Sequence, residues 1–162
     1  MKRVDQENVQ RRACAMRLRE LVDDLPGVRP VPDVLPEDAE PSFYNFILAY
    51  EAEELGISRQ TFAEAVQAEG IPIKCGFYTP LSLMPVFVNR DAWPFRLAEN
   101  RESVERNPYG EGTCPVGEAF MDKGHLELKV HPPTEISHVE DAGRAIRKVI
   151  ENVGELQTRR RV

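Results

Sequence analysis

The chain has 162 residues, of which 41% are hydrophobic, so it can form one domain that buries roughly 70% of its unfolded surface. Its formal net charge of −6 argues against nucleic acid as a partner. No stretch approaches the roughly 18 apolar residues of a membrane span, and no apolar segment follows the charged first residues. We therefore expect a cytoplasmic protein that does not bind a membrane.

The opening residues predict a helix with one apolar face, formed by Cys14, Leu18, Leu21, Val22 and Leu25. Pro26 and Gly27 end it. The proline-rich and acidic residues 28–41 predict an extended connector with no core of its own.

Residues 42–51, "SFYNFILAYE", predict a strand that is covered on both faces, because apolar side chains occupy both alternating sets. A short helix follows Gly56, with Ser58 as its N-cap and Gly70 as its stop. Residues 71–77 then alternate as a strand with one buried face.

Residues 88–114 lack periodicity and predict a long surface excursion, followed by a short helix with Pro115 in its first turn. Residues 126–130 predict a half-exposed strand with Glu127 and Lys129 on its solvent side. The last helix should begin with a capping box of Ser137 and Glu140. Its predicted buried stripe is Val139, Ala142, Ile146, Val149, Ile150 and Val153.

This order of elements predicts an α+β fold in which helices pack on one small sheet. Three cysteines at wide spacings fit neither a disulfide framework nor a zinc motif, and we expect them to be reduced. They are Cys14, Cys75 and Cys114. The three histidines, at spacings of six and seven residues, match no metal-ligand pattern, so we predict no metal site. They are His125, His131 and His138.

Several motifs resemble a known family when they are taken in order. They are "FYNFILAYEAEELGISRQTFAEAVQAEGIPIKCGFYTPLSLMPVF", then "YGEGTCPVGEAF", then a helix after "VHPP". This set is similar to the C-terminal small domain of the DegT/DnrJ/EryC1/StrS aminotransferases, which depend on pyridoxal phosphate and act on keto-sugars and related cyclic substrates. The resemblance implies the small, antiparallel-type sheet of the fold-type-I small domain.

The resemblance also implies a division of the chain. Residues 1–27 would be a helix that links to a large domain, and residues 28–162 would be the small domain. In the family the large domain carries the lysine that binds pyridoxal phosphate, and the sequence shows no region similar to it. We expect no cofactor-binding or catalytic residue in this chain, and the five lysines should be solvated. These are Lys2, Lys74, Lys123, Lys129 and Lys148.

The apolar loop "GFYTPLSLMPVF" matches a family loop that faces the cofactor cleft. The resemblance makes Tyr78, Pro80 and Ser82 the candidates for the substrate cleft, with Ser82 where the family commonly has a histidine. A serine can still hydrogen-bond but cannot act as an imidazole. The alternative, that Tyr78 and Leu81 cover the core of their own domain, stays open at this point. For Glu118 the sequence favours a role in capping a helix or pairing with a cation.

Two functions follow. The first is the small domain of a sugar-type aminotransferase, which is active only when a large domain completes it. The second is a stand-alone binding or assembly module, or a decayed remnant, with the same fold. Either would leave an apolar surface for a large domain or for self-association. The residues expected there are Phe77, Leu81, Leu83, Met84 and Phe87.

Overall fold

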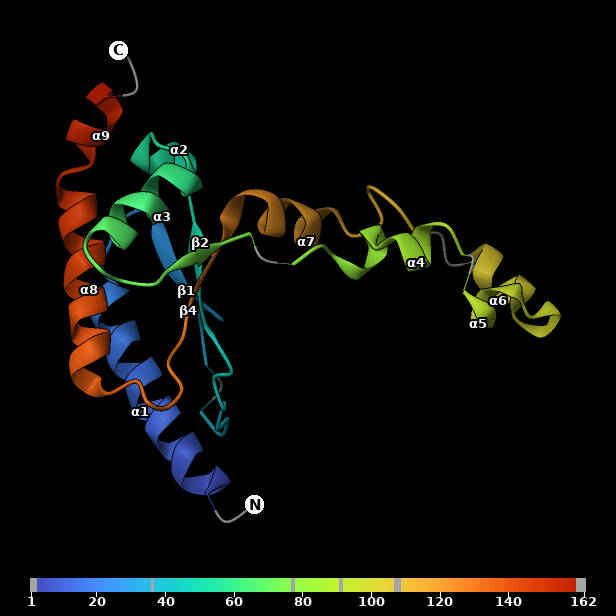
Figure 1. Cartoon of the computed structure of the whole chain (residues 1–162), viewed down its shortest axis with the longest axis horizontal. Helices are drawn as coiled ribbons and strands as arrows, with labels where there is room; N and C mark the ends of the chain where they lie inside the picture. Colours follow the sequence, from blue (N-terminus) through green and yellow to red (C-terminus); the bar gives the residue numbers. More distant parts are fainter. Residues whose placement is uncertain (1–2, 36, 77, 91, 107–108, 160–162) are drawn as a thin grey trace. The chain divides into compact units, whose positions relative to one another are not determined.

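The computed structural model describes residues 3–35, 37–76, 78–90, 92–106 and 109–159 (Figure 1). The chain divides into two compact units, and each is described by itself. Unit 1 comprises residues 1–75 and 123–162, and unit 2 comprises residues 76–122. Within the described residues, no helix is long and apolar enough to cross a membrane.

Unit 1 contains a four-stranded antiparallel sheet in the order β1-β2-β4-β3. The strands are β1 (Val28–Val31), β2 (Phe46–Tyr50), β3 (Lys74–Cys75) and β4 (His125–Leu128). In the register, Leu48 of β2 lies opposite Pro30 on one side and Leu126 on the other. This order places β2 and β4 in the centre of the sheet and β1 and β3 at its edges.

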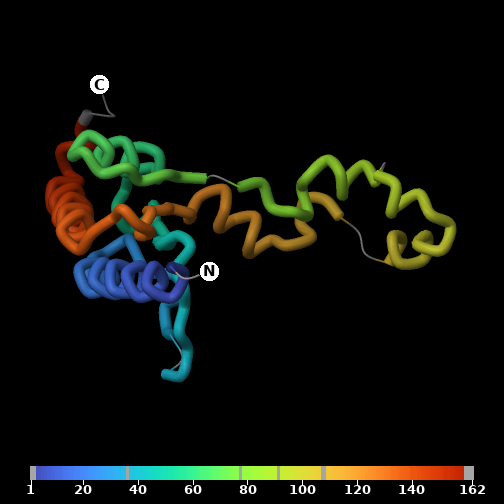
Figure 2. Tube along the Cα trace, turned by 60° about the horizontal axis from the view of Figure 1, so that its bottom comes forward, coloured from blue at the N-terminus to red at the C-terminus, as the bar shows by residue number. Residues whose placement is uncertain are grey.

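The helices of unit 1 pack on the sheet, with α1 and α8 side by side (Figures 1 and 2). Their bounds are α1 (Val4–Val22), α2 (Ala52–Leu55), α3 (Arg59–Ala68), α8 (Ile136–Glu151) and α9 (Val153–Arg159). The expected α+β fold with a small antiparallel sheet is confirmed.

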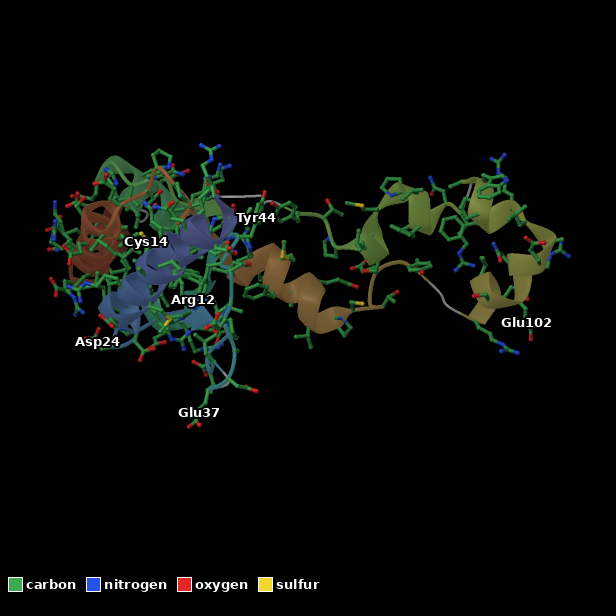
Figure 3. All side chains as sticks on the ribbon, turned by 90° about the horizontal axis from the view of Figure 1, so that it is seen from below. Arg12, Cys14, Asp24, Glu37, Tyr44 and Glu102 are labelled. Carbon is green, nitrogen blue, oxygen red and sulfur yellow. The ribbon has the colours of Figure 1, made fainter. Side chains whose placement is uncertain are left out.

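The core of unit 1 lies between these helices and one face of the sheet. Because strand side chains alternate between faces, Leu48, Leu126 and Leu128 meet the apolar stripes of the helices. The stripe of α1 contributes Leu18 and Val22, which are fully buried. Figure 3 shows Arg12 and Cys14 on α1, and the thiol of Cys14 donates to the carbonyl of Thr134 at 3.6 Å.

Two predictions about strands were wrong. Residues 28–31 form a strand, where the sequence suggested a connector, because pairing with β2 outweighs the low strand propensity of Pro30 at this edge. The strand predicted over residues 71–77 shortens to Lys74–Cys75, since Pro72 has no N–H to donate.

The solvent side of β4 also differs from the prediction. Glu127 is only 4% exposed, and all four residues of β4 are buried. Alternation in the sequence identifies the two faces of a strand but does not show whether both are covered.

Helix caps were predicted with mixed success. The hydroxyl of Ser58 accepts from Thr61 N at 3.1 Å, which confirms the N-cap of α3. The capping box of α8, however, is formed by Glu135 and His138 rather than by the predicted Ser137 and Glu140. Glu140 instead binds Arg17 of α1 at 2.9 Å, so a tertiary ion pair occupies this carboxylate.

Unit 2 consists of short helical segments without a strand among its described residues. They are η1 (Leu81–Leu83), α4 (Pro85–Val88), α5 (Trp93–Arg96), η2 (Ala98–Asn100), α6 (Arg101–Arg106) and α7 (Pro115–Ala119), and η3 (Phe120–Gly124) follows α7 into unit 1. Pro115 is in the first turn of α7, as predicted. No apolar side chain among its described residues is buried.

Gly143 allows α1 and α8 to approach closely. A Cβ added there would lie 2.8 Å from both Cβ and Cδ1 of Leu21. Beside this contact, Arg147 donates to the Leu21 carbonyl at 3.2 Å and to Asp24 at 2.7 Å, just past the end of α1. The absence of a side chain at one position thus fixes the distance between two helices.

We predict that Gly143→Ala lowers the free energy of unfolding by about 1 kcal/mol. The steric cost of roughly 1–3 kcal/mol exceeds the gain in helix propensity of up to about 1 kcal/mol. Chemical denaturation measures the change. The matched control is Gly154→Ala in α9, where a Cβ would meet nothing within 4 Å, and it should be neutral or slightly stabilising. Equal effects of the two changes would contradict the close approach.

Candidate functional site

The three predicted cleft residues lie in unit 2, at and just before η1. Pro80 is the N-cap of η1, and its carbonyl accepts from Leu83 N at 2.9 Å. Ser82 lies inside η1 and is 6% exposed, and its hydroxyl has no hydrogen-bond partner among the described residues. A buried hydroxyl without a partner is uncommon in native proteins. Ser82 is therefore the most distinctive polar group of this segment.

Two apolar side chains close to Ser82 in the sequence are exposed. Tyr78 is 47% exposed and Leu81 is 65% exposed. Neither side chain is buried among the described residues of unit 2. Phe77, which the sequence also assigned to this surface, lies outside the described residues.

Three aromatic rings hold unit 2 together. Phe87 lies 5.9 Å from Phe95 and 5.3 Å from Tyr109, measured between ring centroids, and Phe95 lies 6.4 Å from Tyr109. Tyr109 comes from the far end of the excursion, so this cluster ties residues 87–109 into a loop. The prediction of a long, irregular surface segment omitted this cluster, because its rings are far apart in the sequence.

Glu118 organises the turn that follows Tyr109. Its carboxylate accepts from the backbone N–H groups of Gly112 at 2.8 Å and Cys114 at 2.9 Å. Cys114 is the N-cap residue of α7, which has no side-chain cap hydrogen bond, so Glu118 stabilises the turn before the helix rather than capping the helix itself. The two backbone hydrogen bonds, first that from Gly112 and then that from Cys114, lower the pKa of Glu118.

A second polar group, which the sequence did not suggest, lies in unit 1. His125 and Glu127 are two residues apart on β4 and therefore share one face, and they are 2% and 4% exposed. Burial lowers the pKa of His125, with the charge of Glu127 opposing this shift and that of Arg59 adding to it. The Oε2 atom of Glu127 has no hydrogen-bond partner in the part of the chain that the structure describes.

The lysines that the structure describes do not form a site for pyridoxal phosphate. Lys74, Lys123, Lys129 and Lys148 are all exposed, and Lys148 binds Glu69 at 2.6 Å. Lys2 lies outside the described residues. A lysine that reacts with a carbonyl near neutral pH must be desolvated or placed beside other cations. The described lysines do not fit this role.

The described residues also contain no group of three or more His, Cys, Asp or Glu side chains that could hold a metal ion. The three histidines are separated: His125 is buried in β4, His131 is half-buried in the turn after it, and His138 is in the first turn of α8. The described cysteines are all free thiols.

We predict that the turn at Gly112 loosens in acid. Because the folded-state pKa of Glu118 is lowered, its contribution is present above the ordinary glutamate pKa of about 4.3 and is lost as the pH falls through the lower, folded-state value. Amide signals of Gly112 and Cys114, followed by NMR from pH 7 to pH 3, should move together in this range. In Glu118→Gln the acceptor remains but does not ionise, and the same transition should vanish.

The sequence was compared with models of protein families and with curated proteins. Residues 1–145 match the model of the DegT/DnrJ/EryC1/StrS aminotransferase family. No curated protein matches the sequence.

Solved structures of similar fold include S. venezuelae DesV in complex with a ketimine intermediate, at a TM-score of 0.67 and 21% identity over 93% of this chain and 33% of that one. The aminotransferase TlmJ from Streptoalloteichus hindustanus has a TM-score of 0.63 and 20% sequence identity, and the match covers 94% of this chain and 34% of that one. A DegT/DnrJ/EryC1/StrS aminotransferase from Brucella abortus has a TM-score of 0.60 and 21% sequence identity, and the match covers 89% of this chain and 31% of that one. The chain spans about a third of the length of these proteins.

The family model covers most of the chain and the small sheet with its helices recurs in these structures, so the chain belongs to the DegT/DnrJ/EryC1/StrS aminotransferase family.

Proposed function

We propose that this chain acts as the C-terminal small domain of a sugar-type aminotransferase dependent on pyridoxal phosphate. Completed by a large domain, it would take part in transferring an amino group to a keto-sugar or cyclic ketone. The observation that carries this proposal is the family match over residues 1–145 in a chain one third as long as the similar aminotransferases.

The chain's own residues would contribute to the substrate side of the cleft. Ser82 offers a buried hydroxyl that has no partner among the described residues, and a hydroxyl can donate to and accept from a sugar oxygen. Pro80 fixes the start of η1, and the exposed ring of Tyr78 lies two residues before it. The cofactor would be held mainly by the large domain, because the exposed lysines described above do not suit it.

The exposed apolar side chains of unit 2 favour the binding of a partner. Exposed apolar side chains of this unit include Leu81, Val86, Val88, Trp93 and Val116, with Trp93 at 72% and Val116 at 84%. Exposed apolar side chains that gather in a patch mark interaction sites in soluble proteins. We assign this surface to the large domain in the completed enzyme, and to a second copy of the chain when that domain is missing.

The second candidate function is a binding or assembly module without transamination. The same surface of unit 2 favours it, since an interaction surface needs no cofactor. The two proposals differ in one observable property: only the aminotransferase domain should restore activity to a large domain of the family supplied as a separate polypeptide.

We predict that the chain alone does not bind pyridoxal phosphate covalently. After mixing and desalting, the chain should show no internal-aldimine absorbance that borohydride abolishes, whereas a full-length aminotransferase of the family shows it. This follows from the exposure of the described lysines. A stable adduct mapped to one lysine would show that the chain holds the cofactor by itself.

We predict that the chain self-associates at micromolar concentration through unit 2. The double change Leu81→Ser and Trp93→Ser should shift it toward monomer in analytical ultracentrifugation, because it removes two of the most exposed apolar side chains of this unit. Val4→Ser with Val9→Ser, which alters exposed valines on α1, is the matched control and should leave the distribution unchanged. A monomeric parent chain would refute the association.

A further inference from the structure

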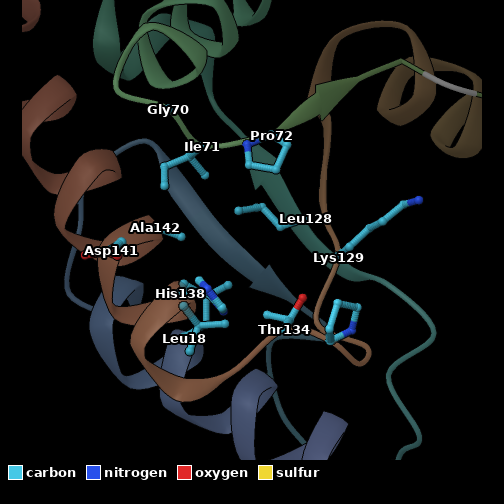
Figure 4. Close-up of a pocket in the computed structure, with 12 residues that line it drawn as sticks. Leu18, Gly70, Ile71, Pro72, Leu128, Lys129, Thr134, His138, Asp141 and Ala142 are labelled. Atoms are coloured by element: carbon cyan, nitrogen blue, oxygen red, sulfur yellow. The ribbon is translucent and has the colours of Figure 1, made fainter.

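A cavity of about 360 Å³ lies wholly within unit 1, between α1, the start of α8, the segment Gly70–Pro72 and the end of β4 (Figure 4). Its volume falls within the roughly 300–1,000 Å³ that is typical of small-molecule sites. None of its lining residues belongs to unit 2. It therefore shares no residue with the predicted cleft.

The cavity exists because β3 and β4 part at Pro72. The ladder between these strands pairs Lys74 with Glu127 and Cys75 with Leu126, and it ends there. Proline cannot donate the next hydrogen bond, so the chain leaves the sheet and uncovers one side of Leu128. With Leu18, Val139 and Ala142, which are also buried, Leu128 gives the cavity an apolar floor.

Two polar side chains line the cavity beside this floor: Thr134 is half-buried and His138 is exposed. The Nδ1 atom of His138 accepts from Glu135 N at 3.0 Å, so the neutral imidazole carries its proton on Nε2. The carbonyl of Thr134 is occupied by Gln10 and Cys14, but its hydroxyl makes no hydrogen bond within the described ranges. Figure 4 shows His138 and Thr134 on the side of the cavity opposite Ile71 and Pro72. The site therefore offers two donors on one side.

The charges at the rim do not suit an ionic ligand. Asp141 is paired with Arg144, and Figure 4 shows the side chain of Lys129 leading away from the cavity. A charged ligand would lose part of its hydration at the apolar floor, and the paired Asp141 and the outward side chain of Lys129 would compensate little of that cost. An uncharged ligand loses nothing comparable.

We propose that this cavity binds a small, uncharged ring compound with one carbonyl group. The ring would pack on Leu128 and Val139, and the carbonyl oxygen would accept from Nε2–H of His138 and from the hydroxyl of Thr134. The proposal does not depend on the aminotransferase function, since it uses different residues.

Three probes of similar size test this proposal by NMR titration of the labelled chain. Acetophenone has the ring and the carbonyl, ethylbenzene lacks the acceptor, and benzoate carries a charge. Acetophenone should saturably shift the amide signals of Ile71, Thr134, His138 and Val139. Ethylbenzene should bind roughly thirtyfold more weakly, the value of the two net hydrogen bonds that it cannot accept, and benzoate should also bind more weakly than acetophenone. Equal affinity for all three, or shifts confined to other residues, would overturn the proposal.

Two variants locate the site. Thr134→Val keeps the shape and removes the hydroxyl, so it should weaken acetophenone and leave ethylbenzene unchanged. Ala142→Leu narrows the cavity and should weaken both, whereas Ala13→Leu, at an exposed position on α1, should weaken neither. Circular dichroism checks that each variant is folded. If Ala142→Leu unfolds, the Thr134→Val result decides: an equal loss for both probes, or no loss for either, rejects the proposed donors.

Discussion

The close contact between α1 and α8 is the constraint on which the rest of unit 1 depends. Gly143 has no side chain, and Leu21 occupies the space that a Cβ would need. At this separation the apolar stripes of both helices reach the same face of the sheet, where Leu18 and Ile146 are fully buried. The ion pairs Arg17–Glu140 and Arg147–Asp24 fasten the two helices at points along their length. The contact between α1 and α8 thus allows both helices to cover the same face of the sheet.

Much of this arrangement could be predicted from periodicity. The stripes of α1 and α8 repeat every three or four residues, and the buried positions Cys14, Leu18, Ile146 and Val149 were all identified. Ser58 was identified as an N-cap because its hydroxyl acts on a backbone N–H three residues away, which is a local interaction. Such features can be predicted because the residues that form them are close together in the sequence.

The features that were missed depend on partners far away in the sequence. Strand β1 exists because β2 pairs with it, and the burial of His125 and Glu127 depends on tertiary packing that no local pattern encodes. Glu140 was expected in a cap but pairs with Arg17, 123 residues earlier. The candidate cleft residues came from resemblance rather than from pattern, and the structure adds that Ser82 is buried while Tyr78 is exposed.

The two outer strands have a consequence for how copies of the chain can meet. A sheet edge normally offers a row of unpaired N–H and C=O groups on which another strand can be added. Strand β1 carries Pro30 and is followed by Pro32, and β3 is only two residues long, with Pro72 shortly before it. Neither edge offers a continuous template, so growth of one sheet across several molecules, the first step toward fibrils, is disfavoured even when the chain is concentrated.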